Sequence, residues 1–163
     1  MVVISDTSPV SGLYRINHLF LLERLFGRVI LPDAVFQEIL QLRSFGYDLK
    51  EILTADWIEV KSATNVSEVG NLLHHLDLGE AEAIVLAKEL HADLLVMDES
   101  KGRAMAQQEG ITIIGLAGIL VEAKAAGHIT SVKLLLDRLL DEVNFRMSRQ
   151  LYEFVLRQVG EMP

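Results

Sequence analysis

The chain has 163 residues, half of them hydrophobic, a formal net charge of −8 and no cysteine. This length suits one domain with a substantial core, and the lack of cysteine excludes disulfides and thiolate metal sites. The negative charge argues against general electrostatic capture of nucleic acid or of an anionic membrane. The longest uncharged apolar run, residues 110–121, is too short to span a membrane. No secretory signal opens the sequence, so we expect a cytoplasmic protein.

Five short apolar runs have the character of buried strands, because each is apolar on both faces instead of alternating. In chain order they are residues 2–5, 29–31, 57–60, 94–97 and 112–114. Segments with the apolar period of helices separate them. This alternation predicts an α/β fold with a parallel sheet and helices on both sides.

Caps and apolar faces mark the helices more clearly than the strands. Six helices are predicted, beginning at Pro32, at Asp77 or Gly79, at Ser100, at Leu116, after Thr130 and after Ser148, with Ser100 and Thr130 as caps. Residues 62–68 are expected to form a flexible loop and residues 141–147 a hinge. We expect one domain over residues 1–163, with the helices of residues 130–159 packed on it or at an interface.

Acidic residues stand at positions where a parallel sheet would gather them. Asp6 ends the first strand and Asp98 ends the fourth, so both are expected at the same edge of the sheet, within reach of one ion. Glu38 lies on the flank of a buried helical face. Glu80 and Glu82 share the first turn of a mostly apolar helix, but a separation of two residues makes them face different ways. Only one of them is expected to point into a site.

Each acid taken alone could simply cap a helix or complement a helix dipole. Together they are harder to explain structurally, because two charges 4 Å apart repel by on the order of 4 kcal/mol at an effective dielectric near 20. A hard divalent cation removes that cost. Oxygen ligands without cysteine favour Mg²⁺ or Mn²⁺ over Zn²⁺.

Four motifs follow one another along the chain: Ile4-Ser5-Asp6-Thr7-Ser8-Pro9, Leu31-Pro32-x-x-Val35-x-x-Glu38, Leu78-Gly79-Glu80-Ala81-Glu82-Ala83-Ile84, and Leu95-Val96-Met97-Asp98 with Gly102-Arg103. Residues 115–120 and the segment Phe145-Arg146-x-Ser148 continue the pattern. This order and spacing resemble the PIN-domain family, and in particular its VapC-like branch of predicted nucleic-acid-binding proteins. The resemblance spans nearly the whole chain.

The resemblance implies a three-layer α/β/α fold and a metal-dependent ribonuclease acting on single-stranded RNA, commonly the toxin of a toxin-antitoxin pair and commonly a homodimer. By position, Asp6, Glu38, Glu82 and Asp98 match the acidic, metal-binding set of the family, and Ser8 matches the small hydroxyl residue that supports the first acid. The third acid of the family is usually Asp, whereas this chain has Glu82 with Glu80 as a rival.

The expected chemistry is hydrolysis of an RNA phosphodiester by a metal-activated water, with Mg²⁺ or Mn²⁺ as the main partner of the phosphate. Lys101 and Arg103, just beyond Asp98, are the nearest candidates for contact with the phosphate. The partners expected are therefore single-stranded RNA, an antitoxin or regulatory protein, and a second copy of the chain.

Two other classes remain open. The chain could be a non-catalytic PIN-like module that binds nucleic acid or protein and acts in regulation. It could also be a Mg²⁺-dependent phosphatase or phosphotransfer domain, since acids at strand ends serve that chemistry as well. The phosphatase interpretation is weakened because Asp6-Thr7-Ser8 lacks a second aspartate two residues on.

Overall fold

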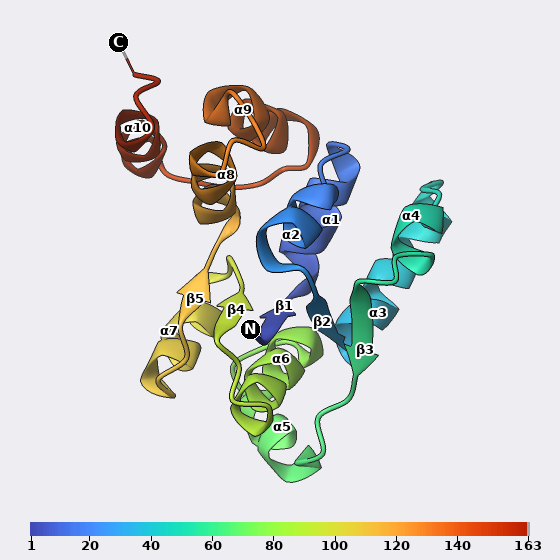
Figure 1. Ribbon diagram of the computed structural model, residues 1–163. Coiled ribbons are helices and arrows are strands. Elements are labelled where there is room, and N and C mark those ends of the chain that lie inside the picture. Colours follow the sequence, from blue (N-terminus) through green and yellow to red (C-terminus); the bar gives the residue numbers. More distant parts are fainter. Residues whose placement is uncertain (163) are drawn as a thin grey trace.

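A five-stranded parallel sheet lies at the centre of the computed structural model, which describes residues 1–162 (Figure 1). In spatial order its strands are β3 (Ile58–Lys61), β2 (Val29–Pro32), β1 (Val3–Ser5), β4 (Leu94–Val96) and β5 (Ile113–Ile114). Every neighbouring pair runs parallel. The strands agree with the predicted runs to within one residue at each end, and the α/β class is confirmed.

Helices connect the strands and cover both faces of the sheet (Figure 1). They are α1 (Thr7–Arg15), α2 (Phe20–Phe26), α3 (Asp33–Leu40), a 3₁₀ helix η1 (Gln41–Phe45), α4 (Lys50–Leu53), α5 (Val66–Leu72), α6 (Leu78–Glu89), α7 (Ser100–Gln108), α8 (Leu116–Ala125), α9 (Val132–Glu142) and α10 (Arg149–Gln158).

Successive strand side chains enter two different cores, as the alternation of a pleated strand requires. Val3 and Val96 join a core with residues of α1, α2, α8 and α9, whereas Ile4 and Leu95 join a second core with residues of α5, α6 and α7. Because both faces are covered, the strands are apolar throughout rather than alternating. The three-layer α/β/α architecture implied by the family resemblance is confirmed.

Two predicted helix caps are wrong by one residue. Glu99, not Ser100, precedes α7, and its carboxylate accepts a hydrogen bond from the backbone N–H of Lys101. Ser131, not Thr130, caps α9, with its Oγ accepting from the N–H of Leu134 at 3.0 Å. In both cases two adjacent residues carry oxygens that can cap, so composition alone does not choose between them.

The flexible loop predicted for residues 62–68 is in part a helix. Asn65 caps α5 by accepting from the N–H of Glu68, so α5 begins at Val66. The carboxylate of Glu89 accepts from the backbone N–H groups of Thr64 and Asn65 and ties the preceding turn to α6. This side-chain to backbone bonding comes from a distant segment and has no local sequence signal.

The C-terminal helices lie at one end of the molecule, where α9 packs on α8 and α1 (Figure 1). The helix α9 continues through Glu142, so the first two residues of the predicted hinge are helical. Within residues 1–162, no helix has the length and apolar character needed to cross a bilayer.

Candidate functional site

Asp6 and Asp98 lie at the same edge of the sheet because β1 and β4 are paired neighbours. The backbone N–H of Asp6 donates to the carbonyl of Val96 at 2.9 Å, extending the pairing to the residue where the first acid stands. Asp6 is 6% exposed. Burial, reinforced by the negative charges of Asp77, Glu38 and Asp98, raises the pKa of Asp6 to about 7.

Asp98 caps a helix, but not the helix that follows it in sequence. Its Oδ1 accepts from the N–H of Leu116 at 3.0 Å, at the start of α8, where the cap position itself is Gly115 and offers no side chain. Within the part of the chain that the structure describes, the other oxygen, Oδ2, is buried without a hydrogen-bond partner. Burial raises the pKa of Asp98, and the nearby guanidinium of Arg103 opposes that rise.

Glu38 turns inward from α3 and meets the start of α1. The hydroxyl of Thr7 donates to Glu38 Oε2 at 2.6 Å. On its other side, Glu38 lies against Gly79 of α6, where an added Cβ would come within 2.8 Å of Oε1. A hydroxyl of the first helical turn therefore orients Glu38, and it belongs to Thr7. Ser8, which the family resemblance implies supports Asp6, is exposed and lines the same small cavity as Asp6.

Glu80 and Glu82 face different ways, as their spacing predicts. Glu80 is 7% exposed and completes a capping box, in which its Oε1 accepts from the N–H of Asp77 while Asp77 accepts from the N–H of Glu80. Within residues 1–162, its Oε2 is buried without a partner. Burial, then the carboxyl of Asp77 and the charge of Asp6, raise the pKa of Glu80 to about 8.

Glu82 points away from this cluster. Its Oε1 accepts from the N–H of Ala34 at 2.8 Å, in the first turn of α3, and its Oε2 accepts from the N–H of Ala63 at 3.2 Å. Both oxygens therefore satisfy backbone groups, which joins α6 to α3 and to the segment after β3. Of the two glutamates, Glu80 is the one that lies with Asp6.

A small cavity of about 180 Å³ opens over Asp6 and Glu80. Its other lining residues are Ser8, His75, Leu76, Asp77, Glu99 and Lys101. Lys101 is exposed at the rim, where its ammonium group can meet an anion entering the cavity. Arg103 lies on the other side of α7, where its Nη1 donates to the carbonyl of Met97 at 3.0 Å.

Glycines near the starts of three helices make room for the acids. An added Cβ would lie 2.8 Å from Glu38 at Gly79, 3.2 Å from Glu80 at Gly102, and 2.5 Å from Oδ1 of Asp98 at Gly115. Contacts below 3.0 Å are not tolerated without movement. Gly79 and Gly102 stand within the sequence motifs that carry the acids, and Gly115 begins the segment of residues 115–120.

The donor set fits a hard divalent cation. All the converging groups are carboxylates, and within residues 1–162 both Glu80 and Asp98 keep a buried oxygen without a protein partner, which a cation would satisfy. In that same stretch, no three acidic or histidine side chains are already drawn together around a common point. The carboxylates are assembled at one edge, and binding of an ion would require them to rotate toward it.

The fold and the site together define an α/β protein whose acids gather at the carboxyl ends of its central strands. A family model described as a PIN domain matches residues 2–161. The chain belongs to the PIN-domain family. Proteins of this family are commonly nucleases and typically use divalent metal ions.

Comparison with curated proteins gives no match. Among solved structures, the chain is similar to a PilT N-terminus domain protein, SSO1118, from the hyperthermophilic archaeon Sulfolobus solfataricus P2. The two share 15% sequence identity with a TM-score of 0.48, over 91% of this chain and 100% of the other.

Proposed function

We propose that the chain is an endoribonuclease that hydrolyses phosphodiester bonds of single-stranded RNA with Mg²⁺ or Mn²⁺. The observation that carries this proposal is the group of Asp6, Glu80 and Asp98, in which Asp6 and Glu80 are buried and, within residues 1–162, one buried oxygen each of Glu80 and Asp98 lacks a partner. Such a group is costly unless it is protonated or bound to a cation.

Asp6, Glu80 and Asp98 would hold the ion, with Glu38 beside them. The family resemblance assigns the third acid to Glu82, with Glu80 as a rival. We choose Glu80 because both oxygens of Glu82 accept from backbone N–H groups. When bound, the ion would supply an activated water and neutralise charge on the scissile phosphate.

The remaining side chains would position the acids and the substrate. Thr7 holds Glu38 through its hydroxyl, and the N–H of Leu116 fixes one oxygen of Asp98. Lys101, at the rim of the cavity, and Arg103, beside Asp98, would contact phosphate oxygens of the strand. A strand would thus meet positive charge at the site although the molecule as a whole is acidic.

The biological setting follows from the family resemblance. We propose that the chain is the toxin of a toxin-antitoxin pair of the VapC-like branch, acting in the cytoplasm as a homodimer and held in check by an antitoxin or other regulatory protein.

Cleavage of a labelled single-stranded RNA, with and without Mg²⁺, tests the activity. The wild type should cleave only with the metal, and Asp98→Asn should lose at least about 100-fold in rate, comparable to losing an essential catalytic interaction. Glu23→Gln, at an exposed position on α2, is the matched control and should cleave as the wild type does.

Repeated purification of the wild type and of both variants guards against a contaminating nuclease. Metal-independent cleavage, or equal cleavage by Asp98→Asn, would contradict the proposal. Binding of RNA without turnover would instead favour the non-catalytic regulatory module.

A further inference from the structure

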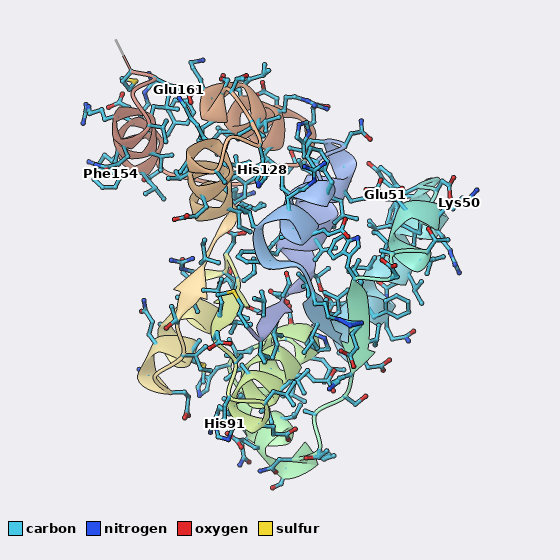
Figure 2. The ribbon with its side chains drawn as sticks, in the orientation of Figure 1. Lys50, Glu51, His91, His128, Phe154 and Glu161 are labelled. Carbon is cyan, nitrogen blue, oxygen red and sulfur yellow. The ribbon has the colours of Figure 1, made fainter. Side chains whose placement is uncertain are left out.

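A groove of about 910 Å³ adjoins the acidic site. Asp98 and Arg103 are among its lining residues, and α7, β5 and α8 form one wall. The segment of residues 145–148 and the helix α10 form the opposite wall, where Phe154 is labelled in Figure 2. The groove is five times the volume of the cavity over Asp6, since the two measure about 910 and 180 Å³.

The start of α7 forms the ridge between these two cavities. Asp98 and Ser100 line the groove, whereas Glu99 and Lys101 line the small cavity. Consecutive residues therefore face opposite sides of one ridge. A linear polymer bound across the acids would extend from the small cavity into the groove.

The outer wall is built from the segment Phe145-Arg146-x-Ser148, which the sequence singled out and the acidic site does not use. Asn144 adopts a left-handed conformation with φ of 55°, a region that asparagine tolerates better than most residues, and so turns the chain after α9. The N–H of Phe145 then donates to the carbonyl of Leu139, and Ser148 caps α10. These bonds hold the segment opposite β5.

The chemistry of the wall is aromatic and basic. Phe154 is 55% exposed and Leu151 47% exposed, so α10 leaves apolar surface uncovered in the groove. Arg146 is exposed and, within residues 1–162, forms no ion pair. An exposed aromatic ring and a guanidinium without an ion pair, lining one groove, suit a base and a phosphate of a strand.

We infer that the groove binds the nucleotides that flank the scissile phosphate of a single-stranded nucleic acid, with a base against Phe154 and phosphates on Arg146 and Arg103. This inference rests on the proposed function, since a strand cleaved beside Asp98 must continue away from it. Its basis is that Asp98 and Arg103 of the site also line the groove.

The experiment measures binding of a fluorescein-labelled six-nucleotide oligouridine to the full chain by fluorescence anisotropy. Ca²⁺ replaces Mg²⁺ to limit turnover, and a gel checks that the strand stays intact. Phe154→Ala and Arg146→Ala should each raise the dissociation constant about 5-fold or more, the size of losing one stacked base or one phosphate contact. Both side chains are exposed, so thermal melting should be unchanged.

Matched controls lie elsewhere on the surface. Phe45→Ala removes a ring that is 77% exposed on η1, and Arg43→Ala removes an exposed arginine nearby, and both variants should bind as the wild type does. An abasic strand of the same length separates stacking from charge. With that strand, Phe154→Ala should have no effect, whereas Arg146→Ala should still weaken binding.

Binding by Phe154→Ala within about 2-fold of the wild type would overturn the inference, and it is the result expected if a polypeptide occupies the groove. Absence of strand binding by the wild type would overturn it as well. Cleavage assays judge the nuclease proposal separately. If the protein cleaves RNA but Phe154→Ala binds the strand as the wild type does, only the groove inference is refuted. If strand binding depends on Phe154 but no RNA is cleaved, the groove inference stands and the nuclease proposal is refuted.

Discussion

The hydroxyl of Thr7 donates to the carboxylate of Glu38 at 2.6 Å, joining the first turn of α1 to α3 across the candidate site. Thr7 directly follows Asp6, so one short segment supplies both an acid and the group that orients a second acid from 31 residues further along the chain. The donor also gives the Glu38 carboxylate a fixed direction.

Thr7→Val keeps the shape of the side chain and removes the donor. We expect cleavage of RNA to fall about 10-fold, since a hydrogen bond to a charged group is worth about 1.5–3 kcal/mol. Thr7→Ser should restore most of the rate because it restores the hydroxyl. Steady-state kinetics of the three proteins checks this, and equal rates for Thr7→Val and the wild type would refute a positioning role.

Glu80→Gln and Glu82→Gln should separate metal binding from folding. Glu80→Gln removes a buried acid beside Asp6, so it should abolish the thermal stabilisation produced by millimolar Mn²⁺ without lowering the melting temperature in its absence. Glu82→Gln should retain the Mn²⁺ effect. It should cost about 1–3 kcal/mol of stability, because the new amide would turn a donor toward the N–H of Ala34 or Ala63.

Thermal melts of both variants with and without Mn²⁺ provide the measurement. The opposite pattern, with the Mn²⁺ effect lost in Glu82→Gln and kept in Glu80→Gln, would return the metal-binding role to Glu82.

The sequence predicted the sheet because buried parallel strands are continuous apolar runs, and it predicted that Asp6 and Asp98 would meet because both end such runs. It also predicted that Glu80 and Glu82 would face apart. It did not decide which one faces Asp6. That choice depends on Ala34 and Ala63, whose backbone N–H groups come from distant segments and draw Glu82 away.

Other features could not be predicted from local sequence for the same reason. The short helix α5 depends on Glu89 binding the turn before it, and the first N–H of α8 donates to the side chain of Asp98, which follows β4. The groove beside α10 arises because the last helix faces β5 and α8 across it. In each case the deciding contact joins segments that are far apart in sequence.

Gly115→Ala should disturb the site more than the fold. The added Cβ would come within 2.5 Å of Asp98 Oδ1 and 2.9 Å of Arg103 Nη1, so Asp98 must leave the N–H of Leu116. We expect loss of most cleavage and destabilisation of about 1–3 kcal/mol. Chemical denaturation and a cleavage assay measure the two effects.

Gly70→Ala is the matched control for that substitution. Gly70 lies inside α5, and within the described chain nothing comes within 4 Å of an added Cβ. Alanine there should stabilise the protein by about 0.5–1 kcal/mol and leave cleavage unchanged. A similar loss of activity in both variants would show that the clash with Asp98 is not the cause.

Glu161 should make the stability of the C-terminal end of the molecule depend on pH. Its carboxylate, between α10 and α9 in Figure 2, accepts from the N–H groups of Val132 and Lys133 and from the Ser131 hydroxyl, and pairs with Lys124. Burial opposes ionisation, but these bonds prevail and lower the pKa of Glu161 to about 2. Because the pKa is lower in the folded protein than in the unfolded chain, the stabilisation is present above about pH 4.5 and is lost as the pH falls toward 2.

Glu161→Gln should therefore lower the free energy of unfolding by about 1–2 kcal/mol at pH 7, the value of a partly buried anion at a helix N-terminus. The difference from the wild type should shrink as the pH falls from about 4.5 toward 2, because the wild-type carboxyl then becomes neutral too. Urea unfolding at pH 7 and at pH 3 measures both values. A difference that stays constant with pH would mean that Glu161 acts through its shape and not through its charge.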